Sequence, residues 1–441
     1  MVHAPTCQGR GQVAVAAALL LLACAPPAPP GEEAASSPHE RNAAAAWPGF
    51  PLLPDGGFPI AGWCAPPMYE NSRARLTEYA EAGFTVLLPA LDDPYQEMTN
   101  RERLQAARQA GLWAIVRDDR VHPDETRRQG WEKRVEAVVG AYGDSAALLA
   151  YFLADEPPPE VNGSLAGLTA RFSALDPRHP AYVNLLGLSP AGYGHHGLSY
   201  RAYLEGFLEE ARPALFSVDL YTLLRGRDLP NLCPGLDSAR LAGRRLEIPF
   251  WAVLQLTPHL EYRDLTVGEI SYQAMLALAY GAKGLVWFTY WTPRPDATGY
   301  RGGPVTFEGR RTPAFQRVAA VNRRAAPLGR LLGSRAAVLV QHGGTLPRDG
   351  TPLNGEMPLL GASGADLTAG FFPAPPGEPA DTLVLLVSRE YRRPVVAELR
   401  WRGSAEVWDQ PTSTWVPREG TETSLELLPG GAQLLRLRSA R

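Results

Sequence analysis

Residues 148–157 read Leu-Leu-Ala-Tyr-Phe-Leu-Ala-Asp-Glu-Pro. The unbroken apolar run at the start of this segment predicts a strand that is covered on both faces, as in a parallel sheet. Asp155 and Glu156 then place two carboxylates where the strand leaves the core. In barrel enzymes the acid and base groups lie at this end of the strands. The segment therefore predicts both a barrel strand and a candidate catalytic site.

The same alternation of strand and helix extends from Pro59 to Leu332. Apolar runs alternate with segments whose apolar residues recur at helical spacing. The eight runs lie at residues 60–64, 85–91, 113–118, 148–155, 181–186, 216–221, 250–255 and 285–291. This number of units over about 270 residues matches a (β/α)8 barrel. We therefore predict an α/β fold, a TIM barrel, over residues 48–332.

An open, doubly wound sheet is the competing α/β fold. Such a sheet normally carries a glycine-rich phosphate-binding turn after its first strand. The corresponding turn here reads Trp63-Cys64-Ala65-Pro66-Pro67, which cannot cradle a phosphate. This turn favours the barrel over the open sheet.

Residues 333–441 have a different pattern. Short apolar runs are separated by glycine, proline and polar turns, and no stretch has a helical period. The runs lie at residues 338–341, 383–387, 395–401, 406–408 and 433–437. This pattern predicts a small all-β C-terminal sandwich domain.

The first 47 residues are expected to lie outside these domains. Arg10 precedes an apolar run at residues 13–23 that is too short to span a bilayer and is typical of a signal peptide. The run ends in Leu21-Leu22-Ala23-Cys24, which resembles the lipobox of bacterial lipoproteins and implies lipidation of Cys24. An ordinary secretory signal with an unrelated cysteine is the alternative. We expect a lipoprotein signal peptide at residues 1–24 and a tether rich in Pro and Ala at residues 25–47.

A lipid, a tether and a folded domain predict a protein held at a membrane surface of the cell envelope without spanning it. In a Gram-negative cell the lipobox pattern favours the outer membrane. The net charge of −3 gives no electrostatic reason to expect a nucleic-acid partner. Cys64 and Cys233 would remain in an oxidising compartment, where they either pair or stay separate.

Polar and aromatic side chains gather at the predicted C-terminal ends of the barrel strands. The carboxylates among them are Asp155, Glu156 and Asp219. The side chains expected to bind substrate are Trp63, Arg117, Asn184, Tyr221, Gln255, Tyr290 and Trp291. Paired carboxylates suit the hydrolysis of glycosidic bonds, and aromatic rims suit sugar rings. No cluster of His, Cys and Asp has metal-ligand spacing, so we expect neither a metal nor a cofactor.

Three segments resemble a known group of enzymes. Ala154-Asp-Glu-Pro157 is similar to the acid/base signature of clan A (β/α)8 glycoside hydrolases. Residues 272–291 and 312–332 resemble the end of the barrel in family 42-like β-galactosidases and their relatives. The resemblance implies that Glu156 is the general acid/base and that Trp291 is the aromatic residue beneath the scissile sugar.

The chain departs from this family at the expected nucleophile. The family places Glu at the end of the seventh strand, where this chain has Gln255, and Asn before the acid/base, where it has Asp155. Asp219 could supply the second carboxylate and activate water. Alternatively, Asp155 and Glu156 resemble the adjacent pair of substrate-assisted hexosaminidases. Glu261 or Glu269 could also reach in after the seventh strand, although Glu269 suits a helix start.

These residues predict a surface lipoprotein that hydrolyses O-glycosidic bonds of an oligosaccharide or polysaccharide. The alternative is a carbohydrate-binding lipoprotein on a barrel that has lost its nucleophile, and a structural envelope lipoprotein is a third interpretation. Asn184 and Gln255 could equally be buried amides that connect strands. Trp63 and Trp291 could equally pack at the barrel mouth.

Overall fold

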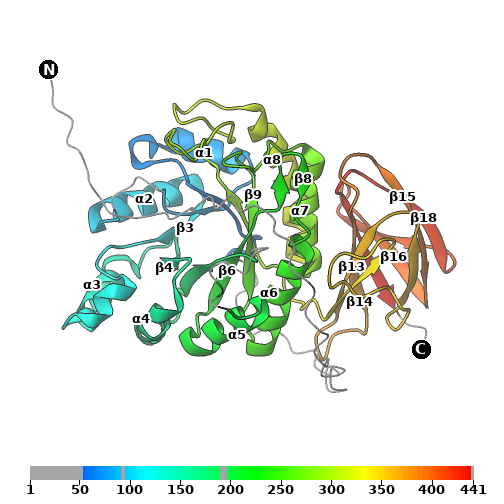
Figure 1. Ribbon diagram of the computed structural model, residues 1–441, viewed down its shortest axis with the longest axis horizontal. Coiled ribbons are helices and arrows are strands. Elements are labelled where there is room, and N and C mark those ends of the chain that lie inside the picture. Colours follow the sequence, from blue (N-terminus) through cyan, green and yellow to red (C-terminus); the bar gives the residue numbers. More distant parts are fainter. Residues whose placement is uncertain (1–52, 91–94, 189–194, 196, 439–441) are drawn as a thin grey trace, which may run out of the picture. The chain divides into compact units, whose positions relative to one another are not determined.

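The computed structural model describes residues 53–90, 95–188, 195 and 197–438. The expected signal peptide (1–24), its Cys24 and the expected tether (25–47) lie outside the described residues. Figure 1 shows the barrel strands and their helices in blue to green and the C-terminal strands in yellow to red.

The first part of the described chain is a closed barrel of parallel strands. The strand order is β1-β2-β3-β4-β5-β6-β9-β10, and β10 pairs with β1 to close the barrel. The strands are β1 (Ile60–Trp63), β2 (Val86–Leu87), β3 (Trp113–Val116), β4 (Leu148–Asp155), β5 (Ala181–Leu185), β6 (Leu215–Leu220), β9 (Phe250–Gln255) and β10 (Leu285–Phe288). The predicted (β/α)8 fold is confirmed. The sequence placed several strand ends too late, because apolar runs continue into the loops at the barrel mouth.

Helices alternate with the strands and cover the barrel. They are α1 (Arg73–Glu81), α2 (Glu97–Ala110), α3 (Trp131–Tyr142), α4 (Asn162–Leu175), α5 (Tyr200–Ala211), α6 (Leu232–Leu246), α7 (Val267–Ala279) and α8 (Pro313–Leu332). Their starts follow capping chemistry, since the side chain of Ser199 accepts from the third residue beyond it. At α7, Thr266 and Glu269 form a reciprocal capping box. None of the helices in the described part of the chain is long and apolar enough to cross a membrane.

The C-terminal part forms two antiparallel sheets, as the predicted sandwich requires. One sheet has the order β11-β13-β14-β19-β16-β17 and the other β12-β15-β18. The strands are β11 (Leu339–Gly343), β12 (Leu359–Ser363), β13 (Leu367–Pro373), β14 (Thr382–Ser388), β15 (Val395–Trp401), β16 (Ser404–Asp409), β17 (Thr414–Arg418), β18 (Glu422–Leu427) and β19 (Ala432–Arg438). The sequence missed β12, β13, β17 and β18. Three of these contain many small or polar residues, which hide the strand pattern.

The C-terminal strands pack on helix α7 of the barrel. A Cβ at Gly268 would overlap the carbonyl oxygen of Tyr391, and a Cβ at Gly370 would overlap that of Ala279. The hydroxyl of Ser271 donates to the carbonyl of Gly430 at 2.9 Å. The two main chains therefore approach so closely that only glycine fits at these positions.

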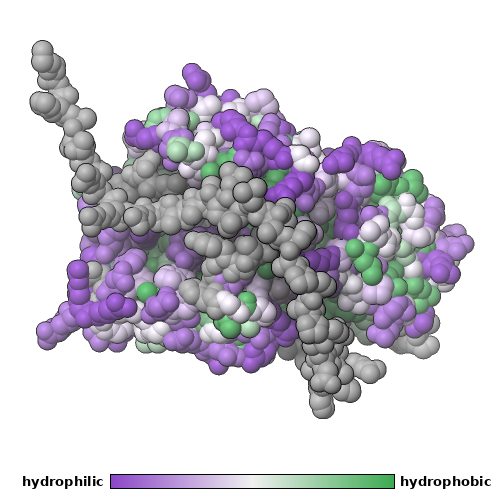
Figure 2. All heavy atoms as spheres, viewed as in Figure 1, coloured by the Kyte–Doolittle hydropathy of each residue, from purple (hydrophilic) through white to green (hydrophobic). Residues whose placement is uncertain are grey.

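The visible surface of the described residues is mostly hydrophilic (Figure 2). Few large apolar side chains are exposed in this part of the chain, and the most exposed are Tyr69 and Met98, at 68% and 69%. Isolated apolar residues of this kind are common on soluble domains. We therefore look for function in the barrel mouth.

Candidate active site

A local irregularity at the end of β4 brings Asp155 and Glu156 to the same place. The pairing of β4 with β5 shifts register between Phe152 and Ala154, so Asp155 lies opposite Asn184. Glu156 has left the strand with φ of 43°, and its amide donates to the carbonyl of Asn184 at 2.9 Å. Consecutive residues of a regular strand would point to opposite faces. The left-handed conformation is unfavourable for a glutamate, and strained residues of this kind cluster at functional sites.

Asn184 joins the carboxylates of β4 and β6. Its Nδ2 donates to Asp155 at 2.9 Å and to Asp219 at 3.0 Å. Its Oδ1 accepts from the hydroxyl of Ser217 at 2.5 Å, and Ser217 also contacts the hydroxyl of Tyr182 at 2.6 Å. Asn184 is almost fully buried. It therefore orients the two aspartates, and the sequence prediction that it contacts substrate has no support in this geometry.

The carboxylates are strongly perturbed by their surroundings. Removal from bulk water raises the pKa of Asp155 to about 6, and the charge of Glu156 adds to this effect against the hydrogen bond from Asn184. Burial raises the pKa of Asp219 well above its usual range, and the charges of Glu156 and Asp155 raise it further. The cluster therefore retains a proton at neutral pH, because adjacent carboxylates cannot all ionise.

The cluster is nevertheless open to water. Asp155 and Glu156 are exposed, and Asp219 is partly exposed. A group at the bottom of a concave mouth is surrounded by protein on most sides while some of its oxygen atoms reach solvent. This arrangement raises the pKa and leaves the group accessible to a ligand.

Aromatic side chains surround the carboxylates. Phe152 lies with its ring centroid 5.9 Å from that of Trp63, and Phe288 lies 6.5 Å from Trp63 on another side. Tyr221, 5.3 Å from Phe288, continues the wall. Such apolar faces suit the C–H surfaces of sugar rings. Phe152 and Phe288 were missed by sequence reasoning, although both are inward-facing by strand alternation.

Helix α5 contributes two tyrosines near the same charges. Burial raises the pKa of Tyr203 to about 12, with smaller contributions from Glu156 and Asp219. Tyr200 is also buried, and its hydroxyl has no hydrogen-bond partner within the described residues. A buried hydroxyl without a partner is costly unless a ligand or water satisfies it.

A small cavity of about 40 Å³ lies beside Asp155. Trp63, Arg117 and Phe152 are among the residues that line it. The guanidinium of Arg117 stacks over the ring of Tyr95 at 4.4 Å, and its charge lowers the pKa of Asp155. This space suits a hydroxyl group or a water molecule better than a whole sugar ring. Trp63 and Arg117 therefore lie beside Asp155, and their contact with a substrate stays a prediction.

Gln255 does not face the carboxylates as a ligand-binding group. Its Oε1 accepts from the amide of Leu223 at 3.0 Å, and its Nε2 donates to the carbonyls of Leu223 and Arg263 at 3.0 and 3.2 Å. The residue is fully buried. The sequence expectation that Gln255 binds substrate is therefore not supported, because main-chain groups already use both ends of its amide. Its alternative interpretation, a buried structural amide, describes the geometry.

The two aromatic residues expected at the end of the eighth strand also lie elsewhere. Tyr290 is fully buried against Tyr79 of α1, with ring centroids 4.7 Å apart, so it does not face the cleft. Trp291 is nearly buried and lies against the guanidinium of Arg75 at 5.4 Å. Strand β10 ends three residues before Trp291, and Phe288 is the aromatic residue that faces the mouth. The sequence could not locate the turn that follows this strand.

The remaining acidic candidates are not near the carboxylate cluster. Glu269 accepts from Arg263 at 2.6 Å and caps α7 through Thr266. Glu261 is exposed, and its carbonyl accepts from the amide of Arg225. Neither residue takes the place of the nucleophilic Glu that the similar glycoside hydrolases carry at the end of the seventh strand.

In the described part of the chain, neither a disulfide nor a metal-binding group accompanies the carboxylates. No disulfide joins the buried Cys64 and Cys233. The ring of His195 contacts the carbonyl of Gly187 at 2.9 Å. In the part of the chain that the structure describes, no group of three His, Cys, Asp or Glu side chains is arranged to hold a metal ion.

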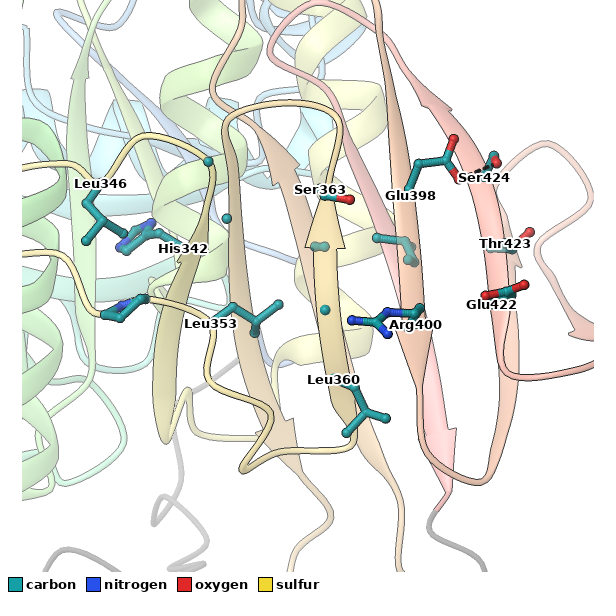
Figure 3. Close-up of a pocket in the computed structure, with 16 residues that line it drawn as sticks. His342, Leu346, Leu353, Leu360, Ser363, Glu398, Arg400, Glu422, Thr423 and Ser424 are labelled. Atoms are coloured by element: carbon teal, nitrogen blue, oxygen red, sulfur yellow. Dashed lines mark hydrogen bonds between the residues drawn. The ribbon is translucent and has the colours of Figure 1, made fainter.

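The C-terminal sheets carry a separate open groove of about 920 Å³ (Figure 3). Glu398, Arg400 and Glu422 project from β15 and β18 on one side, and Leu346 and Leu353 lie on the other. Among the lining residues there is no Trp, Tyr or Phe and no residue of the barrel. The charged residues are a solvated sheet face, so this groove is not the candidate active site.

Several solved protein structures are similar to this chain in fold. No protein-family model and no curated protein matches the chain. A catalytic mutant of Gan42B, a GH42 β-galactosidase from G. stearothermophilus, is similar in structure with a TM-score of 0.58 and 9% identity over 86% of this chain and 98% of that one. The β-galactosidase from Bacillus circulans sp. alkalophilus has a TM-score of 0.57 and 8% identity over 86% and 99%.

A third solved structure is similar over a smaller part. The β-galactosidase from the psychrophilic Marinomonas ef1 has a TM-score of 0.50 and 9% identity over 64% of this chain, which spans only 62% of that enzyme. Identities this low establish the fold and leave the activity open. The chain thus shares its fold with these β-galactosidases.

Proposed function

We propose that this chain is a glycoside hydrolase that cleaves O-glycosidic bonds of an oligosaccharide or polysaccharide. The observation that carries the proposal is the carboxylate cluster of Asp155, Glu156 and Asp219 at the C-terminal ends of β4 and β6. The aromatic wall around the cluster and the fold of the similar structures support it. Trp63, Arg117 and Tyr221 would bind the sugar.

Each carboxyl has a distinct role in the proposal. Glu156, exposed at the end of β4, is the general acid that protonates the departing glycosidic oxygen. Asp219 is the second group, and Asp155 orients it through Asn184. The raised pKa of Asp219 keeps a proton in the cluster at neutral pH. The reaction requires this proton to lie on Glu156 when the glycosidic oxygen departs, because one group must donate while the other carries charge.

The spacing of Glu156 and Asp219 decides the mechanism. An inverting pair must leave ~6.5 to 9.5 Å between its carboxyls for a water molecule, whereas a retaining pair is ~5 Å apart. At the shorter spacing, Asp219 forms a bond to the anomeric carbon as the leaving oxygen takes the proton of Glu156, and water later releases the sugar with Glu156 as base. At the longer spacing, Asp219 takes a proton from the attacking water. The anomer of the first product, observed by NMR, distinguishes the two mechanisms.

The decisive experiment uses residues 47–441 and a panel of polysaccharides and aryl glycosides. Glu156→Gln should lower kcat/KM by at least ~100-fold, because it keeps the shape and removes the proton donor. Glu160→Gln, at an exposed carboxylate in the following loop, is the matched control and should retain turnover. Unchanged hydrolysis in Glu156→Gln would exclude Glu156 as the acid.

A carbohydrate-binding lipoprotein is the second candidate function. Gln255, which stands where the resembling family has its nucleophile, favours it, because its amide is committed to the main chain. The same panel separates the two functions. Thermal stabilisation by an oligosaccharide without turnover would support binding alone.

We also propose that the chain is a lipoprotein of the cell envelope, anchored through Cys24. The Leu-Leu-Ala-Cys segment at residues 21–24 supports this proposal. Metabolic labelling with a palmitate analogue should mark the full chain and should not mark Cys24→Ser. Labelling of both would show that the lipid is attached elsewhere, and labelling of neither would favour an ordinary secretory signal.

A further inference from the structure

Gln255 connects two loops that form one side of the barrel mouth. Its amide pairs with both main-chain groups of Leu223 and with the carbonyl of Arg263. Leu223 begins the hairpin of β7 (Leu223–Leu224) and β8 (Arg227–Asp228). The hairpin starts two residues after Tyr221. The amide of Arg263 also donates to the carbonyl of Leu223 at 3.2 Å. These hydrogen bonds therefore fix the hairpin after β6 against the loop after β9.

Arg263 extends this connection outward. Its guanidinium donates to the carbonyl of Leu224 at 2.6 Å and to the carboxylate of Asp228 at 2.5 Å. It also donates to Glu269, the residue that caps α7, at 2.6 and 2.9 Å. Hydrogen bonds from an arginine to two carboxylates are among the stronger polar contacts of a protein. The guanidinium of Arg263 thus connects the hairpin, the loop and the start of α7.

The C-terminal domain contacts the same charged residues through one hydroxyl group. Tyr391, in the loop between β14 and β15, donates to the carboxylate of Asp228. Its main chain is held at this place, because the carbonyl of Tyr391 lies directly against Gly268 of α7. The ring of Tyr391 also packs on that of Tyr272, at 5.1 Å.

The two connected loops carry aromatic residues of the mouth. Tyr221 precedes the hairpin, and Tyr262 and His259 belong to the loop after β9. The ring of Tyr221 lies 5.7 Å from Tyr262 and 5.3 Å from Phe288. A shift of the hairpin would therefore move one wall of the sugar site.

We propose that Tyr391 of the C-terminal domain is a positioning residue that sets the Tyr221 side of the barrel mouth through Asp228, Arg263 and Gln255. The kinetic part of this inference rests on the proposed glycosidase function, and the positional part does not. The C-terminal domain then acts on substrate binding without contacting the sugar.

The test compares Tyr391→Phe with Tyr280→Phe in the full chain. Tyr280 is the matched control, since its hydroxyl also joins the barrel to the C-terminal domain, by a bond of 3.2 Å to His342, but does not touch the hairpin. Hydrogen exchange followed by mass spectrometry is measured on peptides covering residues 221–229 and 260–264. We expect faster exchange there in Tyr391→Phe and wild-type exchange in Tyr280→Phe.

Kinetics on a nitrophenyl glycoside that the wild type hydrolyses give the second readout. Tyr391→Phe should raise KM about fivefold, the effect of one hydrogen bond, with kcat nearly unchanged. Tyr280→Phe should leave KM unchanged, even if its melting temperature falls as far below the wild-type value as that of Tyr391→Phe. Equal exchange in Tyr391→Phe and the wild type would overturn the proposal whatever the activity. If no protein turns over a glycoside, the proposed function fails and the exchange data alone decide the positional part.

Discussion

At the residue scale, the proposed chemistry depends on how Asp155, Glu156 and Asp219 share charge. Asn184 donates to both aspartates, and this single amide cannot neutralise them. The site therefore keeps perturbed carboxyls together at the expense of folding free energy, as many active sites do. The strained backbone of Glu156 belongs to the same pattern.

The raised pKa of Asp155 predicts a pH-dependent stability. Below pH ~4 the carboxyl is protonated in the folded and the unfolded chain, so it does not affect the free energy of unfolding. Between its ordinary value of 3.8 and about 6 the unfolded chain loses the proton first, so stability falls as pH rises. Asp155→Asn should therefore melt a few degrees above the wild type at pH 7. Differential scanning calorimetry should show this difference vanish at pH 4, and a constant difference would contradict the prediction.

The close packing at Gly187 predicts that activity depends on the position of Asp219. A Cβ at Gly187 would overlap the carbonyl oxygen of Asp219, a main-chain atom that cannot move without moving the carboxylate. Gly187→Ala should lower kcat by about 100-fold, the effect of misplacing a catalytic group by ~1 Å. Gly140→Ala, where the added Cβ meets no atom within 4 Å, is the control for steady-state kinetics. Full activity in Gly187→Ala would show that the chain after β5 yields instead.

At the scale of elements, β9 explains why this barrel lacks a carboxylate where the resembling family has one. The end of this strand is occupied by an amide that both accepts from and donates to the loops beside it. A carboxylate could accept but could not donate to two carbonyls. The second acidic group therefore comes from β6, as Asp219.

This assignment predicts that Gln255→Glu does not create a better enzyme. The change removes both hydrogen bonds that Nε2 donates, although the carbonyl of Leu223 keeps the amide of Arg263 as a donor. It should lower the free energy of unfolding by about 2 kcal/mol. Urea denaturation measures the loss, and turnover should not rise. Gln410→Glu is the matched control, because Gln410 donates to two carbonyls at the protein surface, where water replaces the bonds. An increase in kcat with Gln255→Glu would restore this position as the nucleophile site.

At the scale of the whole molecule, the C-terminal domain and the barrel meet along α7. Glycine at positions 268 and 370 lets main chains approach, and the guanidinium of Arg240 in α6 donates to the carbonyl of Val338 at 3.2 Å. Close main-chain packing resists sliding more than exposed ion pairs do. This packing is what allows one tyrosine of the C-terminal domain to act on the barrel mouth.

Gly268→Ala should loosen this interface. The new methyl group would overlap the carbonyl of Tyr391, and we expect the free energy of unfolding to fall by about 2 kcal/mol. Gly206→Ala, in α5 with no atom within 4 Å of the added Cβ, should instead stabilise by about 0.5 to 1 kcal/mol through helix propensity. Thermal denaturation of the two variants should therefore shift in opposite directions. Equal stabilisation would show that the two domains do not pack tightly at α7.

The sequence by itself determined the barrel, the antiparallel C-terminal region and the acidic pair at the end of β4, because hydrophobic periodicity and strand ends are local properties of a chain. It also placed Asp219, Trp63 and Arg117 at the C-terminal ends of their strands, and their roles toward a substrate stay predictions. The tertiary structure decided the rest. Gln255, Asn184 and Tyr290 have side chains that would suit a ligand, but partners distant in sequence already occupy them. Which polar group remains open to a substrate depends on packing and hydrogen bonds between distant segments, and these exist only once the chain has folded.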